Sequence, residues 1–345
     1  MSETPSQSLM DTIYTRAKAA PQRFAFPEAD DAKMMTAAYR AMEEGLGQSV
    51  LVGDPAALRA LALELGFDAD RFEYVDTCDD ELRARLAKEY CELPVAMFWE
   101  SLVIRRMENP LYFALVMEAL GMVDVTFGGF SSTSADMIQA ATEIVGTDPS
   151  SSTISSVGIE YTPHRTGPEG PYIAVADVST CVDPSPEELA SIAIDSSDTL
   201  RELLGWDVRA AMLCFSTDGS AAHEKVDRVR EAVRIANERR PDLKIDGEMQ
   251  LDAALVPETA AKKMHHESEV AGRANLLVFP DLNAGNIGVK LIEQFGEGEL
   301  YGVIMQGFNK VCSDSSRGAS VEELLGNIAI CCVRAAMLKE RAQVE

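Results

Sequence analysis

The chain has 345 residues, of which 46% are apolar. This length exceeds what one hydrophobic core usually supports, so we expect two domains, or one domain with a large insertion. The net charge of −25 argues against nucleic acid as a partner, because a phosphate backbone requires a basic surface.

Targeting and membrane signals are not evident. No apolar run reaches the roughly 18 residues of a membrane span, and the first twenty residues lack the charged-then-apolar pattern of a signal peptide. The seven cysteines are scattered without paired spacing, which predicts reduced thiols and a cytoplasmic protein. The four histidines include one close pair, His265 and His266, in a polar stretch, and no dedicated metal site is expected.

The first half of the chain alternates between short strand-like runs and helical patterns. Strands are expected at residues 23–28, 49–54, 72–77 and 123–130, and helices at residues 31–47, 55–66, 79–90, 109–121 and 134–146. Such alternation predicts an α/β fold with parallel strands joined by crossover helices.

Two polar turns follow, at residues 146–153 and 162–171, and their Pro, Gly and Ser residues predict a domain boundary near residue 148. The alternation then resumes. Strands are expected at residues 172–180, 209–217 and 275–281, and helices at residues 186–205, 224–240 and 320–341.

A first candidate site is "VFPDLNAGNIGVKLIEQFG", residues 278–296. We read it as a strand ending at Pro280, a turn of small residues, and a helix that carries Lys290. Glycines allow close backbone approach, and free amides at a helix start attract anions. Spacing alone favours an ordinary strand-to-helix connection, because the pattern is neither a dinucleotide fingerprint nor a P-loop.

A second candidate is the polar loop "CSDSSRGAS" that precedes the last helix. Its hydroxyls, backbone amides and Arg317 form a good receptor for phosphate or carboxylate. A cation in the first turn opposes the helix dipole unless an anion binds there. Ser320 and Glu323 also have the spacing of a capping box, so Glu323 is equally well explained as a helix cap or as a catalytic residue.

A third candidate gathers Asp246, Glu248 and Asp252 within seven residues. Three nearby carboxylates suggest a divalent metal site. Their irregular spacing and the scarcity of histidine favour a polar strand end, and no metal ligands are predicted.

These segments, taken together and in this order, resemble the phosphate acetyltransferase (phosphotransacetylase) family. The resemblance runs from about residue 10 to the C-terminus, and "VFPDLNAGNIG" is its most specific string. It is carried by "DGEMQLDAALVPETAAKKM", "VAGRANLLVFPDLNAGNIGVKL", "MQGFNKVCSDSSRGASVEELL" and, more weakly, "PLYFALVMEALGMVD" and "SADMIQAATEIV".

The resemblance implies transfer of an acetyl or other short acyl group between coenzyme A and inorganic phosphate, which yields an acyl phosphate. It implies no cofactor beyond the coenzyme A thioester, which is a substrate. The implied fold is a two-domain isocitrate/isopropylmalate dehydrogenase-like fold with an inter-domain cleft, usually in a homodimer. The expected domains are residues 1–148 with 303–345, and residues 149–302.

The resemblance also assigns roles to individual residues. Ser316 would stabilise the tetrahedral intermediate or the leaving thiolate, Arg317 would hold phosphate or the acyl oxygen, and Glu323 would be the base toward the coenzyme A thiol. Further substrate-binding residues are expected at Asn283, Gly285, Asn286, Lys290, Gln306, Lys310, Thr133 and Ser134.

The first domain departs from the family pattern. Gln139 stands where an arginine is usual and Ser132 where a histidine is usual. In residues 91–113, where the family usually has a basic stretch, Arg105 and Arg106 are the only cations. A non-catalytic homologue that keeps the scaffold for regulation or assembly is therefore the alternative prediction. A pyridine-nucleotide dehydrogenase is disfavoured, because no metal-binding aspartate cluster is evident.

Overall fold

A computed structural model describes residues 5–315 and 317–341, and these divide into two compact units. The first unit holds the described residues up to Asp148 and from Phe308 onward, and the second unit is Pro149–Gly307. Residue 303, where the sequence suggested a return to the first domain, lies inside a strand of the second unit.

The first unit is built on a five-stranded parallel sheet in the order β11-β4-β1-β2-β3. Most of its strands are apolar and buried, as expected for parallel strands covered on both faces. The strands are β1 (Gln22–Phe26), β2 (Gly47–Gly53), β3 (Glu73–Asp76), β4 (Val125–Gly128) and β11 (Val311–Asp314).

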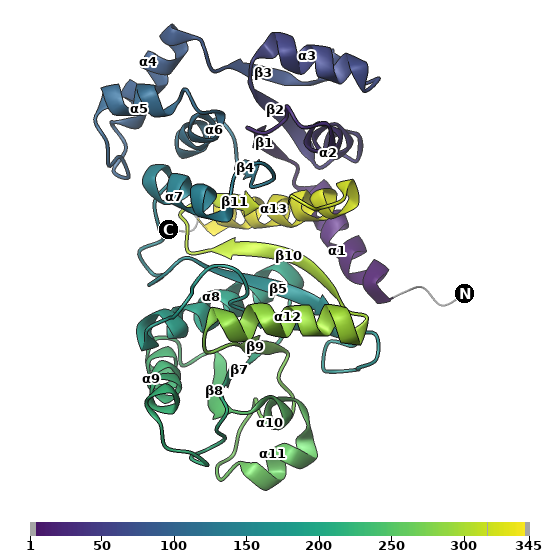
Figure 1. The fold of residues 1–345 in the computed structure, drawn as a ribbon, viewed down its shortest axis with the longest axis vertical. Coiled ribbons are helices and arrows are strands. Elements are labelled where there is room, and N and C mark those ends of the chain that lie inside the picture. Colours follow the sequence, from purple (N-terminus) through teal and green to yellow (C-terminus); the bar gives the residue numbers. More distant parts are fainter. Residues whose placement is uncertain (1–4, 316, 342–345) are drawn as a thin grey trace. The chain divides into compact units, whose positions relative to one another are not determined.

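Helices flank this sheet, with α2 and α6 on opposite sides of β1 and β2 (Figure 1). Helix α13 packs against α1, α2 and β11, and α6 packs against α7 and β4. The unit contains α1 (Pro5–Ala19), α2 (Ala32–Glu43), α3 (Pro55–Glu64), the 3₁₀ helix η1 (Ala69–Arg71), α4 (Asp80–Tyr90), α5 (Glu100–Arg106), α6 (Pro110–Ala119), α7 (Ser134–Ile144) and α13 (Val321–Arg341). The side chains of Asp31, Asp54 and Asp79 cap helix N-termini and so fix where helices begin.

The second unit has a mixed six-stranded sheet in the order β10-β5-β6-β9-β7-β8. The four strands from β6 to β8 in this order are parallel, whereas β5 pairs antiparallel with both β6 and β10. The strands are β5 (Ser155–Tyr161), β6 (Tyr172–Ala176), β7 (Arg209–Leu213), β8 (Lys244–Met249), β9 (Leu276–Val278) and β10 (Glu299–Gln306). Strands β5 and β10 were missed in the sequence, because serine and glycine interrupt their apolar pattern.

Five helices complete the second unit: α8 (Pro186–Leu204), α9 (Glu224–Arg239), α10 (Leu251–Leu255), α11 (Pro257–Lys263) and α12 (Leu282–Gly296). Helices α8 and α9 pack against each other and on the sheet. A core cluster that includes Val175, Leu213, Ala254 and Val289 joins the sheet to α10 and α12.

Two segments expected to be irregular are regular. The turn of small residues expected after Pro280 is the beginning of α12, which the Asp281 side chain caps by accepting a hydrogen bond from the Ala284 N–H at 3.0 Å. The front of the polar loop before the last helix is strand β11, which extends the first sheet by pairing with β4.

Gly285 has a packing reason to be glycine. A Cβ atom at this position would lie 2.1 Å from the backbone oxygen of Asp177, so α12 can approach the segment after β6 only without a side chain there. The described helices include none that is long and apolar enough to cross a membrane.

We predict that Gly285→Ala lowers the free energy of unfolding by about 1–3 kcal/mol, the usual cost of overpacking. Gly296→Ala in the same helix is the control, because its Cβ would meet only Ile292 Cγ2 at 3.9 Å. Urea denaturation of both variants measures the difference. An equal effect at the two positions would contradict the close approach.

Candidate active site

Three loops of the first unit emerge at one edge of its sheet. They follow β1, β4 and β11, which are neighbours and parallel, so their carboxyl ends lie together. Ligands of open α/β sheets bind at this edge. Helices α7 and α13 follow the loops after β4 and β11, so their N-termini, which favour negative charge, begin from the same edge.

The loop after β11 is anchored through Ser315. This residue is buried, and its N–H donates to the Gly128 carbonyl at 3.1 Å. Its hydroxyl lies 3.3 Å from the hydroxyl of Ser313. The predicted catalytic residue Ser316 lies outside the described residues, so its role stays a prediction.

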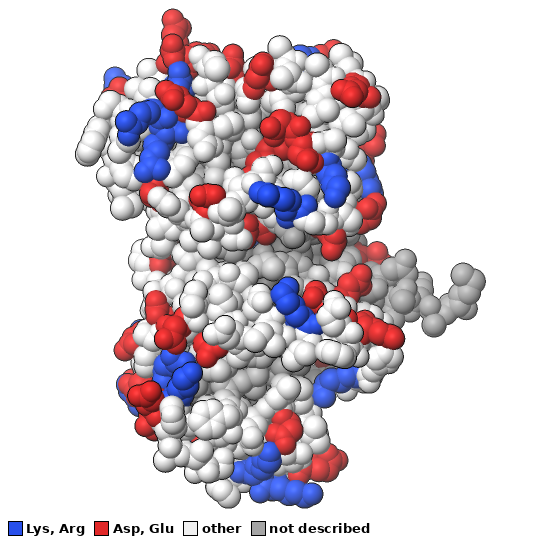
Figure 2. All heavy atoms as spheres, viewed as in Figure 1, with Lys and Arg blue, Asp and Glu red and all other residues white. Residues whose placement is uncertain are grey.

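Arg317 is exposed, and backbone carbonyl groups hold its guanidinium. Nε donates to the Phe130 carbonyl at 3.3 Å, and Nη2 donates to the Ser131 carbonyl at 2.6 Å. Within the described part of the chain it forms no ion pair with a carboxylate. Other arginines of this unit do: Arg23 pairs with Glu73, Arg40 with Glu322, and Arg59 with Asp70. Basic and acidic side chains lie side by side at several places on the face drawn in Figure 2.

A second cation, Lys33, lies at the same loops and was not among the predicted site residues. Its Nζ donates to the Ala319 carbonyl at 3.4 Å and lies 5.9 Å from the centre of the Phe130 ring. Arg317 and Lys33 therefore bring two positive charges to this edge of the sheet in a strongly acidic protein. Such a site attracts anions.

Glu28, which follows β1, is buried beneath these cations with 6% of its surface exposed. Its Oε2 accepts hydrogen bonds from the N–H groups of Phe130 at 2.7 Å and Ser131 at 3.1 Å. Its Oε1 accepts from the N–H of Ser132 at 2.8 Å. One carboxylate thus satisfies three successive amides of the loop after β4.

Asp314, the last residue of β11, contacts the same loop. Burial raises the pKa of Asp314, a hydrogen bond with Ser134 lowers it, and the nearby Glu28 carboxylate raises it further, so the net direction is upward. A Cβ atom on Gly129 would lie 2.4 Å from Asp314 Oδ1, and Gly129 has φ +85°. Only glycine fits at the start of this loop.

Two of the predicted site residues, Glu323 and Thr133, take part in helix caps. The Ser320 N–H donates to Glu323 Oε2 at 2.6 Å, and the Glu323 N–H donates to Ser320 Oγ at 3.2 Å. Thr133 forms the equivalent capping box with Asp136 at α7. These bonds give Glu323 and Thr133 structural roles, and their catalytic and substrate-binding roles stay predictions.

Ser134 begins α7 at this same edge and forms a hydrogen bond with Asp314. The other predicted residues are not on these loops. Lys310 precedes β11 and is at the opposite end of that strand from Arg317. Gln306 belongs to the second unit, is 2% exposed, and bonds to the hydroxyls of Ser155, Ser196 and Thr199. The other four are on α12: Asn283, Gly285, Asn286 and Lys290.

The positive charge of Arg106, which lies near Gln139, is neutralised by Glu143. Arg106 Nη1 lies 3.0 Å from Glu143 Oε2, and the Gln139 amide donates to Glu143 Oε1 at 2.9 Å. A polar pocket of about 260 Å³ adjoins this group and reaches Ser132 of the loop after β4. It is lined by Asn109, Leu111, Tyr112, Ser132, Asp136 and Gln139.

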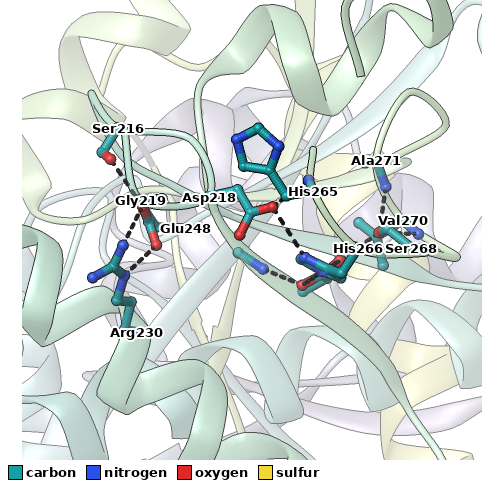
Figure 3. A network of polar contacts seen from close by, with 12 residues as sticks. Ser216, Asp218, Gly219, Arg230, Glu248, His265, His266, Ser268, Val270 and Ala271 are labelled. Atoms are coloured by element: carbon teal, nitrogen blue, oxygen red, sulfur yellow. Dashed lines mark hydrogen bonds and ion pairs between the residues drawn. The ribbon is translucent and has the colours of Figure 1, made fainter. Parts of the chain in front are cut away.

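The carboxylates of the third candidate do not converge. Glu248 is 2% exposed and accepts hydrogen bonds from Arg230 Nε at 2.7 Å and Ser216 Oγ at 2.8 Å, whereas Asp252 binds Lys263 at 2.7 Å. Asp246 instead contacts His266 and Ser268. Figure 3 shows Glu248 with Arg230 as one group and Asp218 with His266 as another. Within the described ranges no three such side chains form a metal cage.

His266 bridges two carboxylates. Its Nδ1 lies 3.3 Å from Asp218 and its Nε2 lies 3.2 Å from Asp246. Partial burial lowers the pKa of His266, but the two carboxylates outweigh burial and raise it above its ordinary value. The imidazole ring therefore links the segment after β7, the strand β8 and the segment after α11.

The predicted site overlooked Glu28 and Lys33. Glu28 comes directly after an apolar strand, and the topology places strand ends together, so its position was a usable signal. Lys33 lies near the start of α2 and carries no motif. Its proximity to the loop after β11 depends on tertiary packing alone.

Comparisons with known proteins support one family. The chain matches the phosphate acetyl/butaryl transferase family over residues 8–332. It is 38% identical over 331 residues to a phosphate acetyltransferase of Clostridium acetobutylicum, covering 95% of this chain and 98% of that protein. A phosphate acetyltransferase of Thermoanaerobacterium thermosaccharolyticum is 37% identical over 332 residues, which is 95% of this chain and 99% of that protein. A solved phosphotransacetylase of Streptococcus pyogenes is 33% identical, with a TM-score of 0.89 over 98% of this chain and 100% of that chain.

Replacing Glu323 separates its two possible roles. Glu323→Gln should keep the free energy of unfolding within about 0.5 kcal/mol, because glutamine completes a capping box, whereas Glu323→Ala should lower it by about 1 kcal/mol. Chemical denaturation gives the stability and steady-state kinetics give the turnover. A general base predicts a loss of about 10²-fold or more in kcat for the glutamine variant, and an unchanged kcat confines Glu323 to the cap.

The His266 bridge predicts a stability difference that depends on pH. Because the pKa of His266 is higher in the folded protein than its ordinary value of 6.5, the bridge stabilises the fold fully at pH values below 6.5. This stabilisation disappears as the pH rises through the folded-state pKa. His266→Gln should therefore lower the free energy of unfolding by about 0.5–1 kcal/mol near pH 5.5, the range of exposed ion pairs, and by less near pH 8.5. His164→Gln, whose histidine has one carboxylate partner, is the control. Equal losses at both pH values would contradict the charged bridge.

Proposed function

Because this chain belongs to the phosphate acetyl/butaryl transferase family and transfers an acyl group between coenzyme A and inorganic phosphate, we propose that its reaction takes place at the loops after β1, β4 and β11. The acyl group is acetyl or another short chain, and the product is an acyl phosphate. The reaction requires no cofactor, since the coenzyme A thioester is itself a substrate.

The state of Arg317 is the observation that carries this proposal. In a chain of net charge −25, its guanidinium is exposed and bound only by the carbonyl groups of Phe130 and Ser131 among the described residues. A guanidinium that no described carboxylate neutralises is available to a phosphate, whose oxygens its planar donors match in geometry. Lys33 adds charge to the same loops.

The chemistry is a phosphorolysis. A phosphate oxygen attacks the thioester carbonyl carbon, the carbonyl electrons move to oxygen, and their return breaks the carbon–sulfur bond and releases coenzyme A as a thiolate that takes up a proton. Catalysis requires phosphate held close to the carbonyl and donors for the oxyanion. We assign phosphate to Arg317, the oxyanion or thiolate to Ser316, and the proton exchange to Glu323.

The substrate-binding assignments of the α12 residues Asn283, Gly285, Asn286 and Lys290 remain part of this proposal, as do those of Gln306, Lys310, Thr133 and Ser134. The protein contacts of Gln306 and the close packing at Gly285 also account for those two residues structurally. A cytoplasmic location and an isocitrate/isopropylmalate dehydrogenase-like fold likewise belong to this proposal.

A homodimer is also proposed. Helix α12 carries Ile287, Leu291 and Phe295 at successive helical turns with 57%, 51% and 84% of their surfaces exposed. An apolar row of this kind supports association with a second copy through α12. Light scattering that finds only monomer at micromolar concentration would contradict this part.

The proposal is tested by acetyl phosphate formation from acetyl-CoA and phosphate. The wild-type protein should turn over, Ser316→Ala should lower kcat by about 10²–10³-fold, and Arg317→Gln should lower kcat/KM for phosphate by about one to two powers of ten. Arg59→Gln removes the same charge from the surface pair with Asp70 and should change neither constant.

Two outcomes would contradict the proposal. Wild-type protein that turns over no short acyl-CoA would leave only a non-catalytic homologue. Normal kinetics in both the Ser316 and Arg317 variants would move the reaction away from the loop after β11.

A further inference from the structure

The contacts of Glu28 and Arg317 involve the same two peptide groups. The first joins Phe130 to Ser131: its carbonyl accepts from Arg317 Nε at 3.3 Å, and its N–H donates to Glu28 Oε2 at 3.1 Å. The second joins Ser131 to Ser132: its carbonyl accepts from Arg317 Nη2 at 2.6 Å, and its N–H donates to Glu28 Oε1 at 2.8 Å.

The two peptide dipoles therefore lie between a carboxylate and a guanidinium. Each peptide is polarised from both ends, and hydrogen bonds arranged in such a chain strengthen one another. Glu28 also takes the N–H of Phe130 at 2.7 Å, so three successive amides fix the loop to β1. Glu28 binds the amide side of the loop, and Arg317 binds its carbonyl side.

This geometry gives Arg317 a fixed position without a direct ion pair. A carboxylate in contact with the guanidinium would compete with an anionic substrate for the same donors. With Glu28 behind the peptides, the hydrogen bonds to described residues use only Nε and Nη2 of Arg317. No bond from a described residue to Nη1, the other terminal nitrogen, is present, so this nitrogen can bind a ligand.

We propose that Glu28 is a positioning residue for the reaction: through the peptide groups of residues 130–132 it orients the guanidinium of Arg317 toward phosphate. The inference rests on the proposed function. It goes beyond that function because it gives the buried Glu28 carboxylate a role in phosphate binding, although Glu28 is distant from Arg317 in the sequence. Glu28 acts on phosphate through Arg317 alone.

Glu28→Gln is the direct test. The side chain keeps its length but loses one acceptor, and its amide nitrogen must then face a loop N–H that also donates. We expect kcat/KM for phosphate to fall by about 10²-fold, the usual cost of misplacing a binding group by about 1 Å. The loss should appear as a raised KM for phosphate, with the KM for acetyl-CoA changed by less than about twofold.

Glu248→Gln is the matched control for a buried carboxylate that holds a loop amide. Glu248 is 2% exposed on β8 and accepts hydrogen bonds from the Gly219 N–H at 3.0 Å and from Arg230 Nε at 2.7 Å, and neither partner is an assigned site residue. Its replacement should leave the KM for phosphate unchanged. If Glu28→Gln shows no cooperative thermal transition, Glu28→Asp, one methylene shorter, carries the test with an expected rise of about tenfold in the KM for phosphate.

A double-mutant cycle shows whether Glu28 acts through Arg317. In an Arg317→Gln background, Glu28→Gln should change kcat/KM for phosphate by less than about twofold, because the group it positions is gone. The same loss in both backgrounds would overturn the proposal. So would a Glu28 variant with the wild-type KM for phosphate.

Hydrogen exchange distinguishes failure of this inference from failure of the proposed function. In Glu28→Gln the amides of Phe130, Ser131 and Ser132 should exchange at least about tenfold faster than in the wild type. If the wild-type protein shows no turnover, the positioning role can still be tested alone. It is supported if Glu28→Gln shows both faster exchange at these amides and weaker binding of inorganic phosphate by calorimetry. Unchanged exchange at these three amides overturns it.

Discussion

The parallel pairing of β11 with β4 is the constraint on which the candidate site depends. Val311 lies opposite Val125 and Asp314 lies opposite Gly128, although nearly two hundred residues separate the two strands in the chain. This register places the loop that carries Arg317 beside the loop that carries Phe130 and Ser131. It also fixes Gly129, where any Cβ would collide with Asp314. A shift of one residue would reverse the facing of every β11 side chain and separate these contacts.

The second physical theme is the placement of charge in a strongly acidic protein. Surface arginines such as Arg23 and Arg59 are neutralised by direct ion pairs with carboxylates. Arg317 instead binds two peptide carbonyl groups, and the N–H groups of the same two peptides donate to the Glu28 carboxylate. Lys33 is likewise bound to a carbonyl group. Two cations without a described carboxylate partner therefore lie at one edge of the first sheet, next to the buried carboxyl groups of Glu28 and Asp314.

Much of the fold could be predicted from the sequence, because strands such as 23–28 and 49–54 are short apolar runs between helices with clear caps. The family resemblance is confirmed by the matched relatives, and it directed attention to the loop that contains Arg317 as the proposed site. Strands β5 and β10 could not be predicted, since their serines and glycines break the alternation and only tertiary pairing explains them. The turn expected at Asn283 was wrong because Asp281 caps a helix there. Glu28 and Lys33 were missed because each acts through contacts with residues far away in the chain.

The central claim is that Arg317 is held ready for an anion at the edge formed by β1, β4 and β11. Calorimetric titration of the wild-type protein with inorganic phosphate at low ionic strength, without acyl-CoA, measures this most directly. We expect saturable binding that weakens by about one to two powers of ten in Arg317→Gln, as the loss of a charge-assisted contact requires. Equal phosphate affinity in the two proteins would contradict the account.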